Sequence, residues 1–380
     1  MRLLCLTQQF RDSTSGLGTY ARALVEGLVR SGHEVTLATA RSQCDDLPGV
    51  RFAPMDFAPG NVTPLAFPRM AFSYRKVLAT EAHRHDVVHF FDAREAAFGR
   101  FPVLPRQGRS VVASLHDSYA LDWCAPGYPR HLYDDRLVRT LYYAWLRWVE
   151  QVAYRWPVGF AANSRHVVAA VVRGYGVPAE RIEVVPIGLP EWVAAEPERL
   201  EGKPAVLFVG GNYQRKGLPI LLRAFARLLG SHRDARLHVV GGDPRVEAFR
   251  AQARELGIGR AVEFHGWQPN RRVRAMMAGA SLFAMPSLVE AFGLVYLEAM
   301  RASTPVVATA TGGATQFFRD GEDVLMVPPG DVDFLAGALE RVYEDRVLRE
   351  RLVRGALVTA SRYTIDSTVR GTEALYARTA

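Results

Sequence analysis

Short runs of apolar residues alternate with longer segments of helical period along the whole chain. The runs are rich in Val, Ile and Leu and are bounded by Gly, Pro or polar residues, as buried strands are. This alternation predicts parallel sheets wound with helices. We expect strands in the first half at 2–7, 33–39, 50–54, 86–92, 110–117, 159–164 and 182–187. We expect strands in the second half at 205–211, 236–242, 261–267, 281–287, 305–311 and 323–329.

The alternation pauses at residues 188–204, which are rich in Pro and Glu and lack apolar periodicity, as a linker does. We therefore predict an α/β protein with a doubly wound first domain over 1–190 and a second over 191–364. A final helix over 365–380 is expected to pack back on the first domain. A length of 380 residues suits two domains. Ligands bind at the carboxyl ends of such sheets, so we expect a site in the cleft between the domains.

Composition narrows the class of protein. The chain is 49% hydrophobic and 23% charged, as ordinary globular proteins are. We expect no transmembrane helix, because no run of about 18 apolar residues occurs. The N-terminus turns polar too early for a signal peptide. Cys5, Cys44 and Cys124 have neither disulfide nor metal spacing, which favours a cytoplasmic location.

The formal net charge of +8 would suit a phosphorylated substrate, an anionic membrane or a nucleic acid. Nucleic acid is the least favoured, because neither zinc-finger spacing nor an Arg/Lys-dense helix occurs, and we expect none as a partner. Only three of the 47 cationic residues are lysines. A lysine within a motif is therefore of particular interest.

Residues 286–300, PSLVEAFGLVYLEAM, place two carboxylates around a Phe-Gly turn at the start of a predicted helix. Glu290 lies on the loop before the helix, and Glu298 lies about one turn inside it. The free N–H groups of the first turn favour a phosphate, and Gly293 lets the backbone approach a ligand closely. Carboxylates there are suited to accept hydrogen bonds from sugar or ribose hydroxyls. The alternative is that Glu290 caps the helix and Glu298 is solvated.

Residues 208–217, FVGGNYQRKG, lead from a predicted strand through two glycines to the adjacent cations Arg215 and Lys216. Two cations at a helix N-terminus can neutralise a diphosphate. The spacing is not that of a P-loop. Isolated cations would more often be solvated surface charges, but the second helix start at 290–293 favours the phosphate interpretation.

Residues 14–21, TSGLGTYA, contain Gly16-x-Gly18-x-x-Ala21, a pattern seen in dinucleotide sites. A polar loop precedes it and no acid ends the second strand, so we do not expect a nicotinamide or flavin cofactor. A glycine loop that closes over a sugar phosphate is the interpretation that stays open.

His116 and Asp117 stand at the carboxyl end of a predicted strand, where active-site groups gather. A structural role for the histidine is weighed equally. Asp331 and Asp333 form an Asp-x-Asp motif at the start of a helix, where capping is favoured over metal binding.

Residues 119–156 alternate Tyr and Trp with Arg. A basic aromatic helix can lie at a membrane interface. A packed helix with some exposed aromatic side chains is slightly favoured, and the region is also a candidate lining of an acceptor groove.

The segment PSLVEAFGLVYLEAMRASTPVVATATGG resembles the Glu-x7-Glu signature of the retaining glycosyltransferases of family 4. The likeness extends through VEFHGWQPN, LFVGGNYQRKGLPILLRAF and DGEDVLMVPPGDVD, and more faintly through SGLGTYARALVEGLVRSGHEVTLAT. It covers essentially the whole chain and is strongest over 205–332. The resemblance implies the GT-B fold, with two Rossmann-like domains and the active site in the interdomain cleft. It implies a nucleotide-diphosphate sugar as donor and no metal or other cofactor.

The resemblance also implies roles for single residues. The glutamate matched by Glu290 contacts the donor sugar, and that matched by Glu298 holds the ribose hydroxyls. The cation matched by Lys216 binds the diphosphate, the histidine matched by His116 lies close to the reacting sugar, and the loop at Gly16 approaches the donor phosphates. We predict as catalytic His116, Glu290, Lys216 and Arg215. We predict as donor-binding Gly16, Gly18, Gly211, Arg215, Lys216, Phe292, Gly293, Leu294 and Glu298, with the backbone amides of 292–294 meeting the sugar and diphosphate.

Three positions depart from the family's pattern. Gly211 stands where many members have an arginine, and we expect Arg215 to take over its duty. Gln316 stands where an acid is common, and Ile187 where Asn is common. These departures concern phosphate and donor recognition rather than the fold.

We predict a retaining, metal-independent glycosyltransferase that moves a sugar from a UDP- or GDP-linked donor to an acceptor hydroxyl. The expected acceptor is a carbohydrate or a lipid-linked molecule, in polysaccharide, glycolipid or glycosylated metabolite biosynthesis. Peripheral contact with an anionic membrane, at its inner face, belongs to this hypothesis. Two alternatives stay open: a sugar-nucleotide epimerase or hydrolase of the GT-B fold, and a non-catalytic carbohydrate- or membrane-binding protein.

Overall fold

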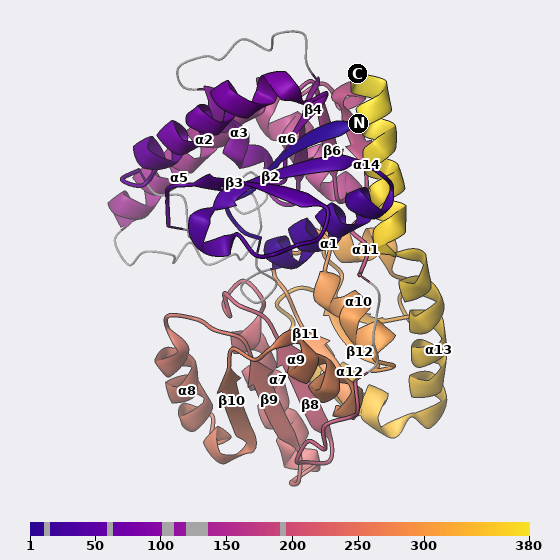
Figure 1. Cartoon of the computed structure of the whole chain (residues 1–380). Helices are drawn as coiled ribbons and strands as arrows, with labels where there is room; N and C mark the ends of the chain where they lie inside the picture. The colour runs from indigo at the N-terminus through magenta and orange to yellow at the C-terminus, as the bar shows by residue number, and fades with distance from the viewer. Residues whose placement is uncertain (11–15, 59–63, 101–109, 119–135, 191–194) are drawn as a thin grey trace. The chain divides into compact units, whose positions relative to one another are not determined.

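The computed structural model describes residues 1–10, 16–58, 64–100, 110–118, 136–190 and 195–380. These residues form two compact units (Figure 1). The first unit comprises the described residues up to Pro190 together with Ile365–Ala380, and the second comprises those from 195 to Thr364. The expected linker ends with residues 195–204. These residues contain neither helix nor strand.

The first unit is built on a parallel sheet that has seven strands within the described residues, in the order β3-β2-β1-β4-β5-β6-β7. Cys5 in β1 pairs with Leu37 on one side and with His89 on the other. Each strand lies within one residue of its expected range, which confirms those predictions. The strands are β1 (Arg2–Leu6), β2 (Glu34–Ala40), β3 (Val50–Met55), β4 (Val87–Phe90), β5 (Ser110–Leu115), β6 (Gly159–Ala162) and β7 (Ile182–Val184).

Helices cover this sheet, and their ends follow ordinary capping chemistry. The helix after β6 begins where the Ser164 side chain accepts a hydrogen bond from Val167 N at 3.2 Å, and it ends at left-handed Gly176. The helices are α1 (Gly16–Arg30), α2 (Phe67–Glu81), α3 (Ala96–Arg100), α5 (Arg136–Ala153), α6 (Arg165–Tyr175) and α14 (Ile365–Thr379).

The last helix, α14, packs against the first unit. A Cβ placed on Gly27 of α1 would lie 2.5 Å from the Val369 side chain, so the two helices approach at a position that admits only glycine. The buried Tyr376 hydroxyl lies 2.7 Å from His89 Nδ1, and His89 Nε2 lies 2.8 Å from Ser114 Oγ. His89, which the sequence left without a role, thus links β4 and β5 to α14.

The second unit has six parallel strands within the described residues, in the order β10-β9-β8-β11-β12-β13. All of them lie inside their expected ranges. The strands are β8 (Ala205–Val209), β9 (Arg236–Val240), β10 (Val262–Gly266), β11 (Leu282–Met285), β12 (Val306–Thr309) and β13 (Leu325–Val327). The helices are α7 (Leu218–Ser231), α8 (Val246–Glu255), α9 (Asn270–Gly279), α10 (Leu294–Arg301), α11 (Gly312–Phe317), α12 (Val332–Glu344) and α13 (Arg346–Arg362).

The strand order of both sheets is that of a doubly wound fold, and it reverses direction at one place in each. The reversal lies between β1 and β4 in the first unit and between β8 and β11 in the second. Ligands of doubly wound sheets bind outside the carboxyl ends of the strands at this switch point. The loops that follow these four strands are therefore where functional side chains are expected.

The structure bears on two of the sequence interpretations. The Asp331 side chain accepts a hydrogen bond from Phe334 N at 3.0 Å and caps α12, as the capping interpretation expected. None of the described helices combines the length and the hydropathy that crossing a bilayer requires.

Candidate active site

The switch point of the second unit brings together two motifs that are distant in sequence. The loop after β8 carries Lys216, and the loop after β11 carries Glu290. The Lys216 ammonium donates a hydrogen bond to Glu290 Oε2 at 2.7 Å. The Glu290 side chain is 9% exposed and that of Lys216 is 23% exposed. The pair is therefore largely shielded from water, which strengthens the interaction.

Backbone contacts hold the two loops in register. Leu288 N donates a hydrogen bond to the carbonyl of Arg215 at 2.9 Å. Gly217 has a φ of +77°, and a Cβ at this position would lie 1.9 Å from the carbonyl oxygen of Pro286. Only glycine meets both demands, since it tolerates positive φ and adds no atom at the contact.

The start of α10 completes this group. Gly293 caps the helix in a left-handed conformation, with φ +94° and ψ +51°, and Leu294 is the first helical residue. Gly313 N, at the start of α11, donates to the carbonyl of Glu290 at 3.1 Å. The Phe292 ring is buried against Phe317, with ring centroids 4.7 Å apart. The Phe292 side chain is therefore unavailable to a ligand, and the predicted contact would involve its backbone amide.

Glu298 lies in the second turn of α10. Burial raises the pKa of its carboxyl group to about 7, while the guanidinium of Arg274 opposes that shift. Within the described part of the chain, no protein donor bonds its side-chain oxygens. Hydroxyl donors of a ligand would satisfy these oxygens and favour the charged form. The position suits the predicted ribose contact.

Two further predicted residues lie on the loop after β8. Gly211 is exposed, and a Cβ there would meet only the carbonyl oxygen of Gly242, at 3.4 Å. Arg215 is half-buried, and its amide donates to Asn212 Oδ1 at 3.2 Å. Gly211 therefore leaves this point of the loop without a side chain.

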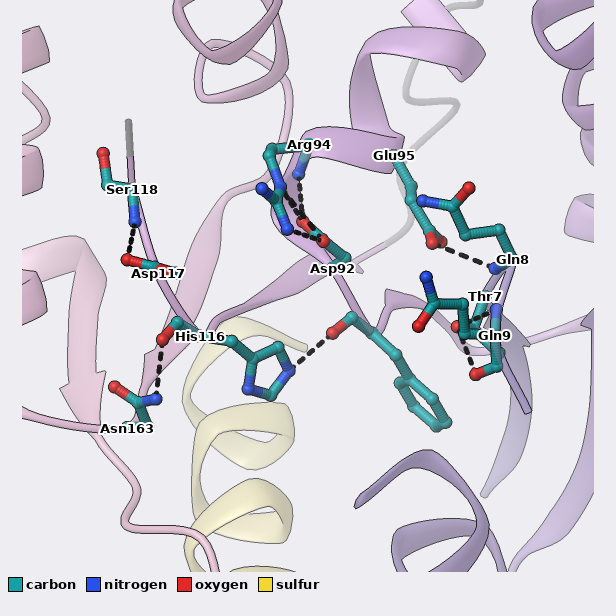
Figure 2. Close-up of polar contacts among 11 residues, drawn as sticks. Thr7, Gln8, Gln9, Asp92, Arg94, Glu95, His116, Asp117, Ser118 and Asn163 are labelled. Atoms are coloured by element: carbon teal, nitrogen blue, oxygen red, sulfur yellow. Dashed lines mark hydrogen bonds and ion pairs between the residues drawn. The ribbon is translucent and has the colours of Figure 1, made fainter. Parts of the chain in front are cut away.

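His116 follows β5 in the first unit, which is a separate body. Its Nε2–H donates to the carbonyl of Phe91 at 2.7 Å (Figure 2). Its ring stands edge-on to that of Tyr20, with the centroids 4.4 Å apart. Burial lowers the pKa of His116, although the nearby Asp92 carboxylate opposes the shift. The ring is therefore neutral at pH 7, and Nδ1 carries the lone pair.

A polar cluster beside His116 was missed by the sequence interpretation. Asp92 accepts hydrogen bonds from the amide and the Nε of Arg94, both at 2.9 Å. The Glu95 Oε1 accepts from Gln8 N at 2.9 Å across the switch point of β1 and β4 (Figure 2). The signal available in the sequence was Asp92 itself, a carboxylate two residues after the buried strand β4.

The two carboxyl groups of this cluster titrate in opposite directions. Burial would raise the pKa of Asp92, but the Arg94 guanidinium holds it below its ordinary value. Burial, and secondly the charge of Asp92, raises the pKa of Glu95 well above its ordinary value. At neutral pH Asp92 is therefore charged, whereas its surroundings disfavour the charged form of Glu95.

One expectation about the first unit needs correction. Gly16 and Gly18 were expected on a glycine loop, but α1 begins at Gly16 and both glycines lie in its first turn. Gly16 is exposed and Gly18 is buried. What these residues offer a ligand is the N-terminus of a helix rather than a mobile glycine loop.

Comparison with known proteins agrees with the geometry of both units. Residues 14–192 match the family described as "Glycosyltransferase Family 4", and residues 192–357 match "Glycosyl transferases group 1". The chain is 39% identical to a D-inositol 3-phosphate glycosyltransferase of Acidothermus cellulolyticus over 53% of this chain and 49% of the relative. The match thus spans about half the length of that relative.

Solved structures match over the full length. A sucrose-phosphate synthase from Thermosynechococcus elongatus has a TM-score of 0.80 and 21% identity, covering 100% of this chain and 98% of that one. Anabaena HepE, solved in complex with UDP and glucose, has a TM-score of 0.72 and 21% identity, covering 100% of both chains. With its two parallel α/β units and the family matches that together span residues 14–357, this chain belongs to glycosyltransferase family 4 and has the GT-B fold.

Proposed function

We propose that this protein is a retaining, metal-independent glycosyltransferase that moves a sugar from a nucleotide-diphosphate donor to an acceptor hydroxyl. The observation that carries the proposal is the Lys216–Glu290 pair at the switch point of the second unit, 2.7 Å apart, beside the start of α10. An ammonium has three N–H donors, and Glu290 takes one of them. The remaining donors can serve the diphosphate while Glu290 accepts from a sugar hydroxyl.

The chemistry asked of this group is electrostatic. As the bond between the anomeric carbon and the diphosphate breaks, negative charge grows on the diphosphate and positive charge on the sugar. Lys216, Arg215 and the free amides at Gly293 would stabilise the negative charge on the diphosphate without a metal ion. The departing phosphate would take the acceptor's proton on the same face of the sugar, which retains the anomeric configuration.

The first unit supplies the acceptor side in this proposal. Neutral His116 would position the reacting sugar, and the charged Asp92 beside it offers an acceptor for a hydroxyl group. Exclusion of water by the bound substrates protects the donor from hydrolysis. Gly16 and Gly18, as a helix N-terminus, would face the donor phosphates.

The donor is proposed to carry UDP or GDP. HepE is named as a complex with UDP and glucose, which makes UDP-glucose the first donor to test. The test is the thermal shift caused by UDP, GDP, ADP and NAD in the wild type and in Glu298→Ala, with exposed Glu255→Ala as the control. We expect one nucleoside diphosphate to stabilise the wild type and the control, and the Glu298 variant to respond less.

Other outcomes separate the alternatives. If no nucleoside diphosphate stabilises the protein, a non-catalytic carbohydrate-binding or membrane-binding protein is the better description. If a nucleotide sugar is consumed at full rate with no acceptor present, an epimerase or hydrolase is the better description. Equal shifts in Glu298→Ala and the wild type would refute the ribose contact.

The acceptor is proposed to be a carbohydrate or a lipid-linked molecule, with the protein lying against an anionic membrane. The support is α5, which exposes Leu141, Ala144 and Trp148 on one face. Residues 119–135 of the same aromatic stretch lie outside the described residues. Co-sedimentation with phosphatidylserine vesicles tests this, and we expect Trp148→Ser to weaken binding. Wild-type protein that stays in the supernatant would refute membrane contact.

A further inference from the structure

Two histidines and a glutamate meet at the edge of the sheet in the second unit, away from the loops assigned to the donor. His238 in β9 pairs with Glu263 in β10, the edge strand among the described residues (Figure 1). The register shifts between Phe264 and Gly266, so His265 occupies a bulge. Bulges re-aim side chains, and here the His265 ring stacks on that of His238, with centroids 5.3 Å apart and planes 18° apart.

The hydrogen bonds of His238 define which of its nitrogens can bind a ligand. Its Nε2 lies 2.9 Å from the carbonyl oxygen of Glu201. A carbonyl only accepts, so Nε2 carries the proton and Nδ1 carries a lone pair. Metal-binding histidines usually donate their second N–H to a carbonyl or carboxylate in this way, which orients the ring. The His238 ring is thus already held as a ligand would be.

Three ligand atoms surround one point. His265 Nε2–H donates a hydrogen bond to His238 Nδ1 at 3.0 Å, and Glu263 Oε2 lies 3.6 Å from His238 Nδ1 and 3.7 Å from His265 Nε2. A bound ion would replace this hydrogen bond, with the His265 proton on Nδ1 instead. A tetrahedral Zn²⁺ ion with bonds of about 2.0–2.2 Å separates its ligand atoms by roughly 3.3–3.5 Å. The observed separations bracket that value. Small movements of the two rings apart and of the half-buried Glu263 side chain inward would bring all three atoms to bonding distance.

We propose that His238 Nδ1, His265 Nε2 and a Glu263 carboxylate oxygen bind one divalent transition-metal ion of the Zn²⁺ type, with water as the fourth ligand. Imidazole and carboxylate together suit Zn²⁺ and its neighbours better than Mg²⁺ or Ca²⁺. His238 is 2% exposed, His265 15% and Glu263 41%, so the ion would be enclosed on the protein side and reachable from solvent on the other. By joining β9 to β10, the ion would stabilise the edge of the sheet.

The electrostatic surroundings favour a cation. Arg272 is the cation close by, and Glu198 accepts its hydrogen bond at 3.0 Å. Glu263 and Glu198 together outweigh that one positive charge.

The test uses the untagged full chain, treated with EDTA and dialysed. Titration with Co²⁺, followed by the visible absorption of four-coordinate cobalt, and calorimetry with Zn²⁺ report coordination directly. We expect one ion per chain, and we expect Zn²⁺ to raise the melting temperature. His265→Ala and Glu263→Gln should weaken binding at least tenfold and lose most of the thermal shift. His238 is too buried to be the primary variant.

The second unit provides a matched control. His232 Nε2 lies 3.4 Å from Glu344 and 3.9 Å from Glu340, and these three form the other group of at least three such side chains among the described residues. His232→Ala should leave the Co²⁺ spectrum and the Zn²⁺ affinity unchanged. The proposal is overturned if the wild type binds neither metal, if His265→Ala binds like the wild type, or if only His232→Ala loses binding. Donor binding is a separate measurement, and none of these outcomes depends on it.

Discussion

Lys216 Nζ lies 2.7 Å from Glu290 Oε2, although the two residues are 74 positions apart. They meet because β8 and β11 are neighbours at the switch point of the second sheet. The pair joins two loops that each carry glycine and a helix start. The proposed donor site rests on this pair.

Lys216→Ala should reduce affinity for the nucleoside diphosphate by roughly tenfold to a hundredfold, because a hydrogen bond to a charged group contributes about 1.5–3 kcal/mol. Turnover should fall by about 10²-fold or more, as when one preorganised donor is removed. Calorimetry with the diphosphate measures the first effect, and release of nucleotide measures the second. Exposed Lys203→Ala in the same unit is the control. Equal losses in both variants would contradict a specific role.

Replacing Glu298 by Gln should change how stability depends on pH. Because the folded pKa is raised to about 7, the folded state keeps its proton above the unfolded pKa. The wild type therefore loses stability as pH rises from about 5 to 7, and the glutamine variant does not. The difference in melting temperature between Glu298→Gln and the wild type should grow over that range. A difference that is constant from pH 5 to pH 8 would contradict the raised pKa.

Gly217→Ala should destabilise the second unit and abolish diphosphate binding. The added Cβ would collide with the Pro286 carbonyl at a backbone conformation that already disfavours alanine. Gly257→Ala is the matched control, because its φ of +73° is similar but a Cβ there meets nothing within 4 Å. In urea unfolding, we expect the control to lower the free energy of unfolding by about 1 kcal/mol. We expect Gly217→Ala to lower it by clearly more. Equal midpoints would show that the loop contact is not rigid.

His116→Ala should lower turnover by about 10²-fold while leaving the affinity for nucleoside diphosphate nearly unchanged. The reason is that His116 belongs to the first unit, whereas the diphosphate ligands proposed in Lys216 and Gly293 belong to the second. Nucleotide release measures turnover, and calorimetry with the nucleoside diphosphate measures affinity. Exposed His83→Ala in the first unit serves as the control. A large loss of affinity in His116→Ala, matching its loss of turnover, would refute this division of roles.

Much of the fold was readable from the sequence because strand period and turn chemistry are local properties. Runs such as 205–211 and 305–311 are apolar on both faces and bounded by Gly or Pro, which identifies buried parallel strands without tertiary information. The ends of elements were less certain, as α1 shows. Its first turn contains Gly16 and Gly18, residues that local propensity assigns to a loop, and only the packed helix places them.

The site was only partly readable. Glu290, Glu298 and Lys216 stood out because charged groups interrupt apolar or glycine-rich segments. Asp92 and Glu95 did not, since a single acid after a strand is common, and what distinguishes them is burial against Arg94 and Gln8. The His238–Glu263–His265 group carries no recognisable spacing at all. Its members come from paired strands and a bulge, and a pairing between strands is not a property of either strand alone.

The sequence by itself determined the alternation of strands and helices, the break near residue 190 and the residue types available for phosphate and hydroxyl recognition. These follow from hydrophobic period, turn residues and charge, which act over a few neighbouring positions. Tertiary structure alone decided that Lys216 lies against Glu290, that burial raises the pKa of Glu298, and that His89 meets Tyr376. Strand order and packing create those proximities, and desolvation sets the resulting energies, so no local pattern contains them.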